Sequence, residues 1–216
     1  MNLPNKLTVL RILLVPVIVI IYYLGNLGII NGDFLSIPIV NWLILAVFSI
    51  ASYTDHLDGK LARKDNKITA FGKFADPLAD KILVLAVMLI LVESDKLPAW
   101  IPIIVLFREF VVSGYRLIAV ENGGKVIAAN IWGKLKTVTQ IIAIILMYLT
   151  KFGYFDFILR TSTLQGMYEN SALIYMTTGE YIINILATAF MTASVIATIF
   201  SGWSYIKDGK DLFKDC

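Results

Sequence analysis

Four aspartates, set between two apolar stretches, are the residues of this chain best suited to chemistry. Asp55 and Asp58 are three residues apart, and Asp76 and Asp80 are four apart, so each pair lies on one face of its own helix. Ionisable groups beside membrane-like segments are costly, and they indicate a functional site. Carboxylates from two helices are hard oxygen ligands that suit Mg²⁺, Mn²⁺ or Ca²⁺. The sequence therefore predicts a divalent-metal site, and it offers no cluster of Cys and His for zinc.

Small and basic residues stand among these carboxylates. Gly59, Ala62 and Gly72 leave room for a ligand or for a close neighbouring backbone. Arg63 can bind a phosphate or one of the carboxylates. The alternative, a merely exposed charged loop, does not explain why these residue types recur at helical spacings.

The helices that must position these groups are expected to lie in a membrane. The chain has 216 residues, of which 58% are hydrophobic, and its mean hydropathy is +0.76. Soluble domains are about 45–50% apolar, so lipid must cover much of this surface. Six apolar segments approach the length that spans about 30 Å of hydrocarbon. They are Leu7–Leu24, Ile37–Tyr53, Phe74–Val92, Ala99–Val120, Thr137–Leu149, which is short unless residues 133–136 begin it, and Tyr175–Ile206.

We therefore expect an all-α integral membrane protein with six transmembrane helices, forming a single domain over residues 1–216. The segment Asn2–Thr8 is expected to form a short interfacial helix before the first span, because Pro4 suits a first helical turn. No signal-peptide cleavage site follows Leu7–Leu24, so this span is expected to remain. Cys216, the one cysteine, allows no internal disulfide.

The distribution of Lys and Arg predicts the orientation in the membrane. Basic residues gather at alternate connections: Lys6, Arg11, Lys60, Arg63, Lys64, Lys67, Lys73, Lys125, Lys134, Lys136, Lys207, Lys210 and Lys214. The other connections carry only Lys96, Lys151 and Arg160. The positive-inside rule then places both termini and the acidic motif on the cytoplasmic side of a multi-pass cell-membrane protein.

The acidic motif as a whole resembles the signature of the CDP-alcohol phosphatidyltransferase family. Every fixed position of that signature is present: Asp55, Asp58, Gly59, Ala62, Arg63, Gly72, Asp76 and Asp80. The N-x2-T-x2-R pattern of Asn5, Thr8 and Arg11, together with the number of spans, extends the resemblance over most of the chain. Residues 72–81, 108–110 and 133–137 are similar to a bacterial branch of the family.

This resemblance implies transfer of the phosphatidyl group from CDP-diacylglycerol to an alcohol, with release of CMP. Two divalent ions, Mg²⁺ or Mn²⁺, would be bound by Asp55, Asp58 and Asp76. Asp80 would complete the metal site or act as general base on the acceptor hydroxyl. The resemblance also implies a homodimer. The residues it implies for binding CDP are Asp55, Gly59, Ala62, Arg63 and Gly72.

A second polar cluster is expected to bind the acceptor. Arg108 lies near the middle of the fourth span, where it needs a partner, and Glu109 is that partner or lines the cavity. Arg116 lies about 12 Å further along the same helix. Together with Lys134 and Lys136 these residues predict a basic pocket for a small anion such as glycerol 3-phosphate. Thr8, which shares a helix face with Arg11, is added to this pocket.

Two alternatives remain open on the sequence. One is a member of the same family with another acceptor, such as inositol phosphate or a second lipid; serine is disfavoured because it does not require the extra cations. The other is a divalent-cation transporter, which would also place carboxylates between helices. Transporter sites usually lie near the bilayer midplane, whereas this acidic motif is predicted at one membrane face.

Overall fold

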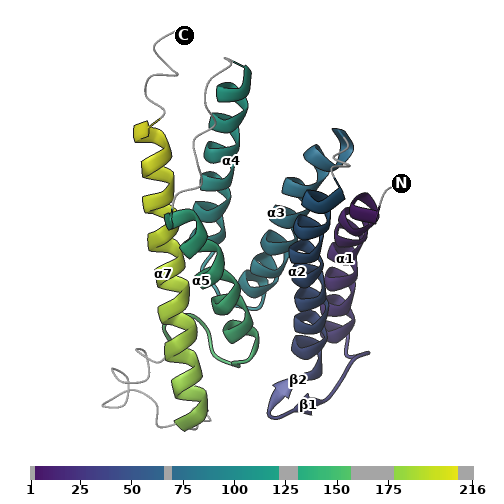
Figure 1. Cartoon of the computed structure of the whole chain (residues 1–216). Helices are drawn as coiled ribbons and strands as arrows, with labels where there is room; N and C mark the ends of the chain where they lie inside the picture. Colours follow the sequence, from purple (N-terminus) through teal and green to yellow (C-terminus); the bar gives the residue numbers. More distant parts are fainter. Residues whose placement is uncertain (1–2, 66–69, 122–130, 157–177, 209–216) are drawn as a thin grey trace. The chain divides into compact units, whose positions relative to one another are not determined.

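The computed structural model describes residues 3–65, 70–121, 131–156 and 178–208. Side chains are described for residues 7–54, 78–115, 131–156 and 178–207. This part of the chain contains six α-helices and one pair of two-residue strands. The chain divides into two compact units, Met1–Ser94 and Asp95–Cys216. Each unit is described by itself below (Figure 1).

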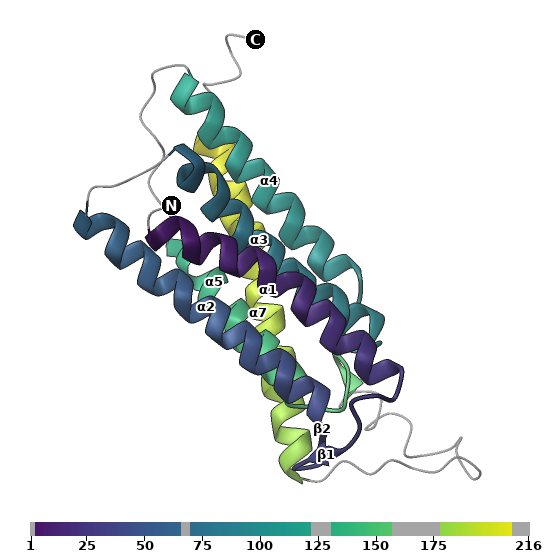
Figure 2. The ribbon, with the colours of Figure 1, turned by 90° about the vertical axis from the view of Figure 1, so that its right-hand side faces the viewer.

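The first unit packs three long helices against one another. These are α1 (Leu3–Asn26), α2 (Ile39–Asp65) and α3 (Ala70–Glu93), and α1 contacts both of the others. They run alternately down, up and down in Figures 1 and 2, so the start of α1, the end of α2 and the start of α3 lie at one end of the unit. The core between the helices is aliphatic and aromatic; its fully or almost fully buried side chains include Ile18, Ile44, Phe48, Leu83 and Val87.

The N-terminal segment is not a separate interfacial helix, contrary to the prediction. Leu3–Thr8 form the first turns of α1, which continues to Asn26. The physical reason lies in the sequence, because no glycine stands between Pro4 and Gly25 to end the helix early. Pro4 itself lies in the first turn, where its missing N–H would have no helical partner in any case.

A tight hairpin joins α1 to α2 at the opposite end of the first unit. Strands β1 (Asp33–Phe34) and β2 (Ile37–Pro38) pair antiparallel, and the two residues between them, Leu35 and Ser36, have φ of 52° and 62°. Two-residue hairpins favour left-handed backbone at both positions, usually supplied by Asn or Gly. Here the Trp42 indole N–H donates to the Phe34 carbonyl at 3.1 Å, and the two rings meet edge to face. This contact from α2 fixes the turn.

The second unit is built from α4 (Trp100–Glu121), α5 (Ile131–Tyr148) and α7 (Thr178–Asp208), with α7 in contact with both of the others. Small residues permit close packing of α5 on α7, and Ala143 and Ala187 are both fully buried. The fifth predicted segment does begin before Thr137. Its helix starts at Ile131, which gives it the length that the shorter assignment lacked.

Threonine hydroxyls in this unit bond within their own helices. Thr139 Oγ1 donates to the Leu135 carbonyl, Thr192 Oγ1 to the Thr188 carbonyl and Thr198 Oγ1 to the Ser194 carbonyl, at 2.7–2.8 Å. Such bonds to the preceding turn satisfy each hydroxyl within its own helix.

A turn after α5 ties one end of the second unit together. The Lys96 ammonium donates to the Thr150 carbonyl at 2.5 Å, and the Asn184 amide donates to the Gly153 carbonyl at 2.9 Å. The Tyr154 hydroxyl lies 2.8 Å from Thr192 Oγ1 on α7. Lys96 is largely buried here, and burial lowers its pKa from 10.5 to about 8.

Three of the described helices are long and apolar enough to cross a membrane: Leu7–Asn26, Ile131–Tyr148 and Thr178–Lys207. A shorter apolar helix covers Ile39–Thr54. The chain is thus a helical protein with membrane-length segments, which agrees with the predicted class. The count of six spans, the cytoplasmic termini and the single-domain organisation stay predictions.

Candidate functional site

The backbone brings the two aspartate pairs to one end of a helical hairpin. Asp55 and Asp58 lie in the last part of α2, and Asp76 and Asp80 lie in the first part of α3. Only residues 66–69 separate the two helices, and Figure 1 shows the end of α2 and the start of α3 at the same end of the unit. Asp80 is exposed. Two helix ends that carry four carboxylates provide a donor set that suits a hard divalent cation.

The side chains of most of this motif lie outside the described part of the chain. This holds for Asp55, Asp58 and Asp76 and for the four other predicted nucleotide-binding residues, Gly59, Ala62, Arg63 and Gly72, although the backbone of all seven is helical. Among the side chains that are described, no group of three or more His, Cys, Asp or Glu could hold a metal. The metal site and the CDP site therefore stay predictions.

Thr8 and Arg11 face the interior of the first unit. Thr8 is 0% exposed and Arg11 is 1% exposed, which confirms that both lie on one buried face of α1. They stand at the same end of the unit as the four aspartates. The assignment of Thr8 to the acceptor phosphate stays a prediction.

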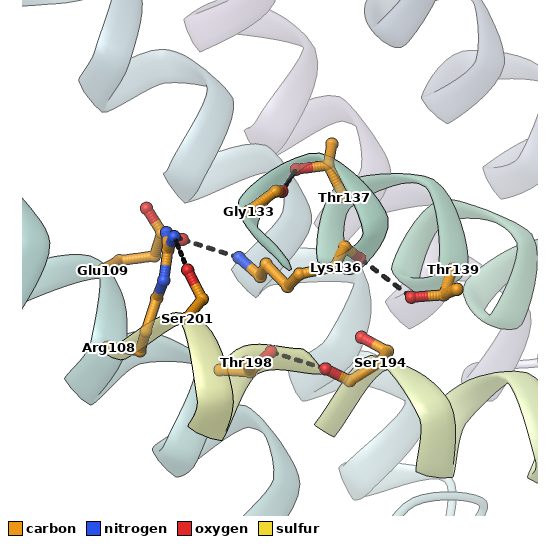
Figure 3. A network of polar contacts seen from close by, with 9 residues as sticks. All are labelled: Arg108, Glu109, Gly133, Lys136, Thr137, Thr139, Ser194, Thr198 and Ser201. Atoms are coloured by element: carbon orange, nitrogen blue, oxygen red, sulfur yellow. Dashed lines mark hydrogen bonds and ion pairs between the residues drawn. The ribbon is translucent and has the colours of Figure 1, made fainter. Parts of the chain in front are cut away.

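In the second unit, a network of charged side chains joins three helices (Figure 3). Arg108 Nη1 donates to Glu109 Oε1 at 2.9 Å, and Lys136 Nζ donates to the same oxygen at 2.6 Å. Arg108 Nη2 donates to Ser201 Oγ at 2.5 Å. Glu109 is thus the partner of Arg108, which confirms one of the two roles predicted for it. Among the described residues, this network joins two cations to one carboxylate oxygen.

Residues of α5 and α7 pack closely around Arg108. The ring of Tyr205 lies 5.8 Å from the guanidinium carbon, within the range of a cation–π interaction. A Cβ added at Gly133 would lie 3.3 Å from Arg108 Nη2, and one added at Gly202 would lie 3.5 Å from Arg108 Cγ. Glycine at these positions lets α5 and α7 approach the arginine. Arg108 Nε is buried and has no hydrogen-bond partner in the described part of the chain.

Of the two lysines predicted to bind the acceptor, only Lys136 joins this network in the described part of the chain. Lys134 is exposed, whereas Lys136 is only 6% exposed. Residues two positions apart on a helix are separated by about 200°, so the two lysines cannot face Glu109 together. Arg116 lies in α4, and its side chain is outside the described part.

Sequence reasoning missed the contribution of α7. Ser201 and Tyr205 lie in a long apolar helix, where a serine reads as a packing residue and a tyrosine as an interfacial anchor. Their spacing of four places both side chains on one helix face, which does not distinguish them from packing residues. Both are almost completely buried, at 0% and 2% exposure.

Comparison with known proteins gives a consistent result. The model of the CDP-alcohol phosphatidyltransferase family matches residues 1–200. A Bacillus subtilis protein named CDP-diacylglycerol–glycerol-3-phosphate 3-phosphatidyltransferase is 38% identical, over 99% of this chain and 97% of that protein. A Rickettsia typhi protein of the same name is 34% identical, over 98% and 99%. A Mycobacterium tuberculosis protein named probable phosphatidylglycerophosphate synthase is 32% identical, over 95% of this chain and 80% of its own length.

Proposed function

Because the chain belongs to the CDP-alcohol phosphatidyltransferase family, we propose that it transfers the phosphatidyl group of CDP-diacylglycerol to glycerol 3-phosphate. The products are phosphatidylglycerol phosphate and CMP. The structural observation that carries the choice of acceptor is the pair of cations, Arg108 and Lys136, that converge on one carboxylate oxygen. A phosphorylated acceptor requires such a positive site, and an uncharged alcohol does not.

Members of this family generally depend on a divalent metal. Asp55, Asp58 and Asp76 would hold it, with Asp80 beside them, because carboxylate oxygens are the ligands that Mg²⁺ and Mn²⁺ prefer. When bound, two such ions neutralise the diphosphate of the donor lipid and the CMP that leaves. Gly59, Ala62, Arg63 and Gly72 would leave space for the nucleotide and bind it.

The chain's own residues then orient the acceptor and accept a proton. Asp80 takes the proton of the acceptor hydroxyl. The hydroxyl oxygen of the acceptor then bonds to the phosphorus that carries the diacylglycerol. The bond from that phosphorus to CMP breaks, and CMP leaves with the electron pair. Arg108, Lys136 and Arg116 hold the acceptor by its phosphate, and Thr8 and Lys134 are further candidates for this contact. The metal and acceptor sites face the cytoplasm in this proposal, and the protein acts as a homodimer.

An acceptor screen tests this function directly. The purified protein in detergent, supplied with CDP-diacylglycerol and Mg²⁺, should release CMP with glycerol 3-phosphate and far less with glycerol, serine or inositol phosphate. Release with inositol phosphate alone would move the protein to another branch of the family. Equal release with glycerol would contradict the assigned role of the two cations. No observation on the described residues favours the divalent-cation transporter over a transferase.

A further inference from the structure

We propose that Glu109 and Ser201 are positioning residues that hold Arg108 and Lys136 in the arrangement in which they bind the acceptor's phosphate. This inference rests on the proposed function. It assigns to α7 a part in acceptor recognition, through a serine that no sequence pattern singles out.

Glu109 holds the two cations together. Its Oε1 accepts from Arg108 Nη1 at 2.9 Å and from Lys136 Nζ at 2.6 Å, so the two positive groups are neighbours of one atom. All three side chains are less than a fifth exposed, and charges repel strongly where water is scarce. Without the carboxylate, Arg108 and Lys136 would repel each other and move apart.

Ser201 fixes the guanidinium from the opposite helix. Its hydroxyl oxygen accepts from Arg108 Nη2, while Glu109 takes Nη1, so both terminal nitrogens of the arginine are held (Figure 3). Ser201 is completely buried, and Gly202 beside it brings the α7 backbone close to the arginine stem. A guanidinium held at both nitrogens loses little freedom when it binds a phosphate, which favours affinity.

Ser194 provides a matched control on the same helix. It is also 0% exposed, and its hydroxyl is buried without a hydrogen-bond partner in the described part of the chain. Figure 3 shows it on α7 beyond Thr198, away from Arg108. Removing the hydroxyl of Ser194 therefore takes away a buried oxygen of the same type but no contact with the arginine.

The experiment compares Glu109→Gln, Ser201→Ala and Ser194→Ala in the full-length protein, with KM for each substrate, kcat and direct binding of glycerol 3-phosphate measured for each. Glu109→Gln and Ser201→Ala should raise KM for glycerol 3-phosphate and weaken its binding, each by roughly tenfold, as expected for loss of one bond to a charged group. The KM for CDP-diacylglycerol should stay within about twofold of wild type. Ser194→Ala should match wild type in all measurements.

Several results would overturn the inference. Tighter binding of glycerol 3-phosphate by Glu109→Gln would show that the carboxylate competes with the acceptor phosphate for Arg108 and Lys136 instead of positioning them. Equal defects in Ser201→Ala and Ser194→Ala would reduce Ser201 to packing, as would unchanged kinetics in Ser201→Ala. If the proposed function is wrong, the wild-type protein will release no CMP with glycerol 3-phosphate. The binding measurement still tests the roles of Glu109 and Ser201 in that case.

Discussion

Lys136 and Lys134 stand two residues apart on α5, yet Lys136 is buried against Glu109 and Lys134 is exposed. This difference follows from the helical turn, since residues two positions apart point to nearly opposite sides. The two lysines, which look equivalent in the sequence, therefore provide a matched pair for testing the acceptor site.

We expect Lys136→Met to raise KM for glycerol 3-phosphate about tenfold to a hundredfold, because a contact between a buried cation and a phosphate contributes roughly 1.5–3 kcal/mol. Lys134→Met should change this KM by less than about threefold. Initial rates at varied acceptor and saturating CDP-diacylglycerol measure both. A larger effect at Lys134 would place the phosphate on the other side of α5.

Asp55→Asn, Asp58→Asn and Asp76→Asn should each abolish CMP release and leave the protein folded in the membrane, since the amides remove negative ligands from the predicted metal site. Asp33→Asn, on β1 at the other end of the first unit, is the control and should retain activity. EDTA should abolish CMP release by the wild-type protein, and added Mg²⁺ or Mn²⁺ should restore it. Full activity in excess chelator would contradict a metal-dependent reaction.

Asp80→Asn should lower kcat, whereas the loss of an acceptor contact should raise KM for the acceptor. It removes the proposed base, so kcat should collapse even at saturating glycerol 3-phosphate. Arg108→Ala should instead raise KM for the acceptor and leave KM for CDP-diacylglycerol within about twofold. Two-substrate kinetics separates the two effects. If Arg108→Ala instead raises KM for CDP-diacylglycerol, Arg108 belongs to the site that binds the donor lipid.

The stability of the second unit should depend on pH through Lys96. Its pKa is lowered from 10.5 to about 8 in the fold by burial, so between these values the unfolded chain binds more protons than the folded one. Stability therefore rises as the pH increases from about 8 to about 10.5, by a gain on the order of 2 kcal/mol. Thermal unfolding in detergent across this range should show the rise in the wild type. Lys96→Met should abolish it, and Lys151→Met, at an exposed lysine nearby, should not.

The predicted orientation can be tested with single cysteines in a Cys216→Ser background. A cysteine at Lys67 should be labelled by an impermeant reagent only from the cytoplasmic side, and one at Asn170 only from outside, because of the asymmetry of Lys and Arg. Labelling of both from the same side would reject the six-span arrangement with cytoplasmic termini.

One contact of the Arg108 network could be predicted from residue types, and the contacts that could not depend on tertiary structure. An arginine inside an apolar span needs a partner, and this physical requirement is enough to point to Glu109 as a candidate. The same requirement cannot choose between Lys134 and Lys136, because that choice depends on which face of α5 meets the arginine. Ser201 could not be found at all, because a serine shows its role only when the opposite helix is in place.

The fold shows the same division. Hydropathy located α4 and α7 closely, whereas α5 starts at Ile131, earlier than the predicted segment Thr137–Leu149. The prediction failed at the N-terminus, where Pro4 suggested a short separate helix, because α1 runs unbroken from Leu3 to Asn26. A proline in a first turn indicates where a helix can begin, and it does not indicate where that helix ends.

The hydroxyls of Thr139, Thr192 and Thr198, which donate to carbonyls of their own helices, have a consequence for how the protein is made. A newly synthesised helix enters the bilayer alone, before its neighbours arrive, and an unbonded hydroxyl would then stand in hydrocarbon. The hydroxyls of these threonines are already hydrogen-bonded within each separate helix. Helices α5 and α7, both long and apolar enough to cross a membrane, therefore need no neighbour to bond these hydroxyls before Ala143 and Ala187 let them pack closely.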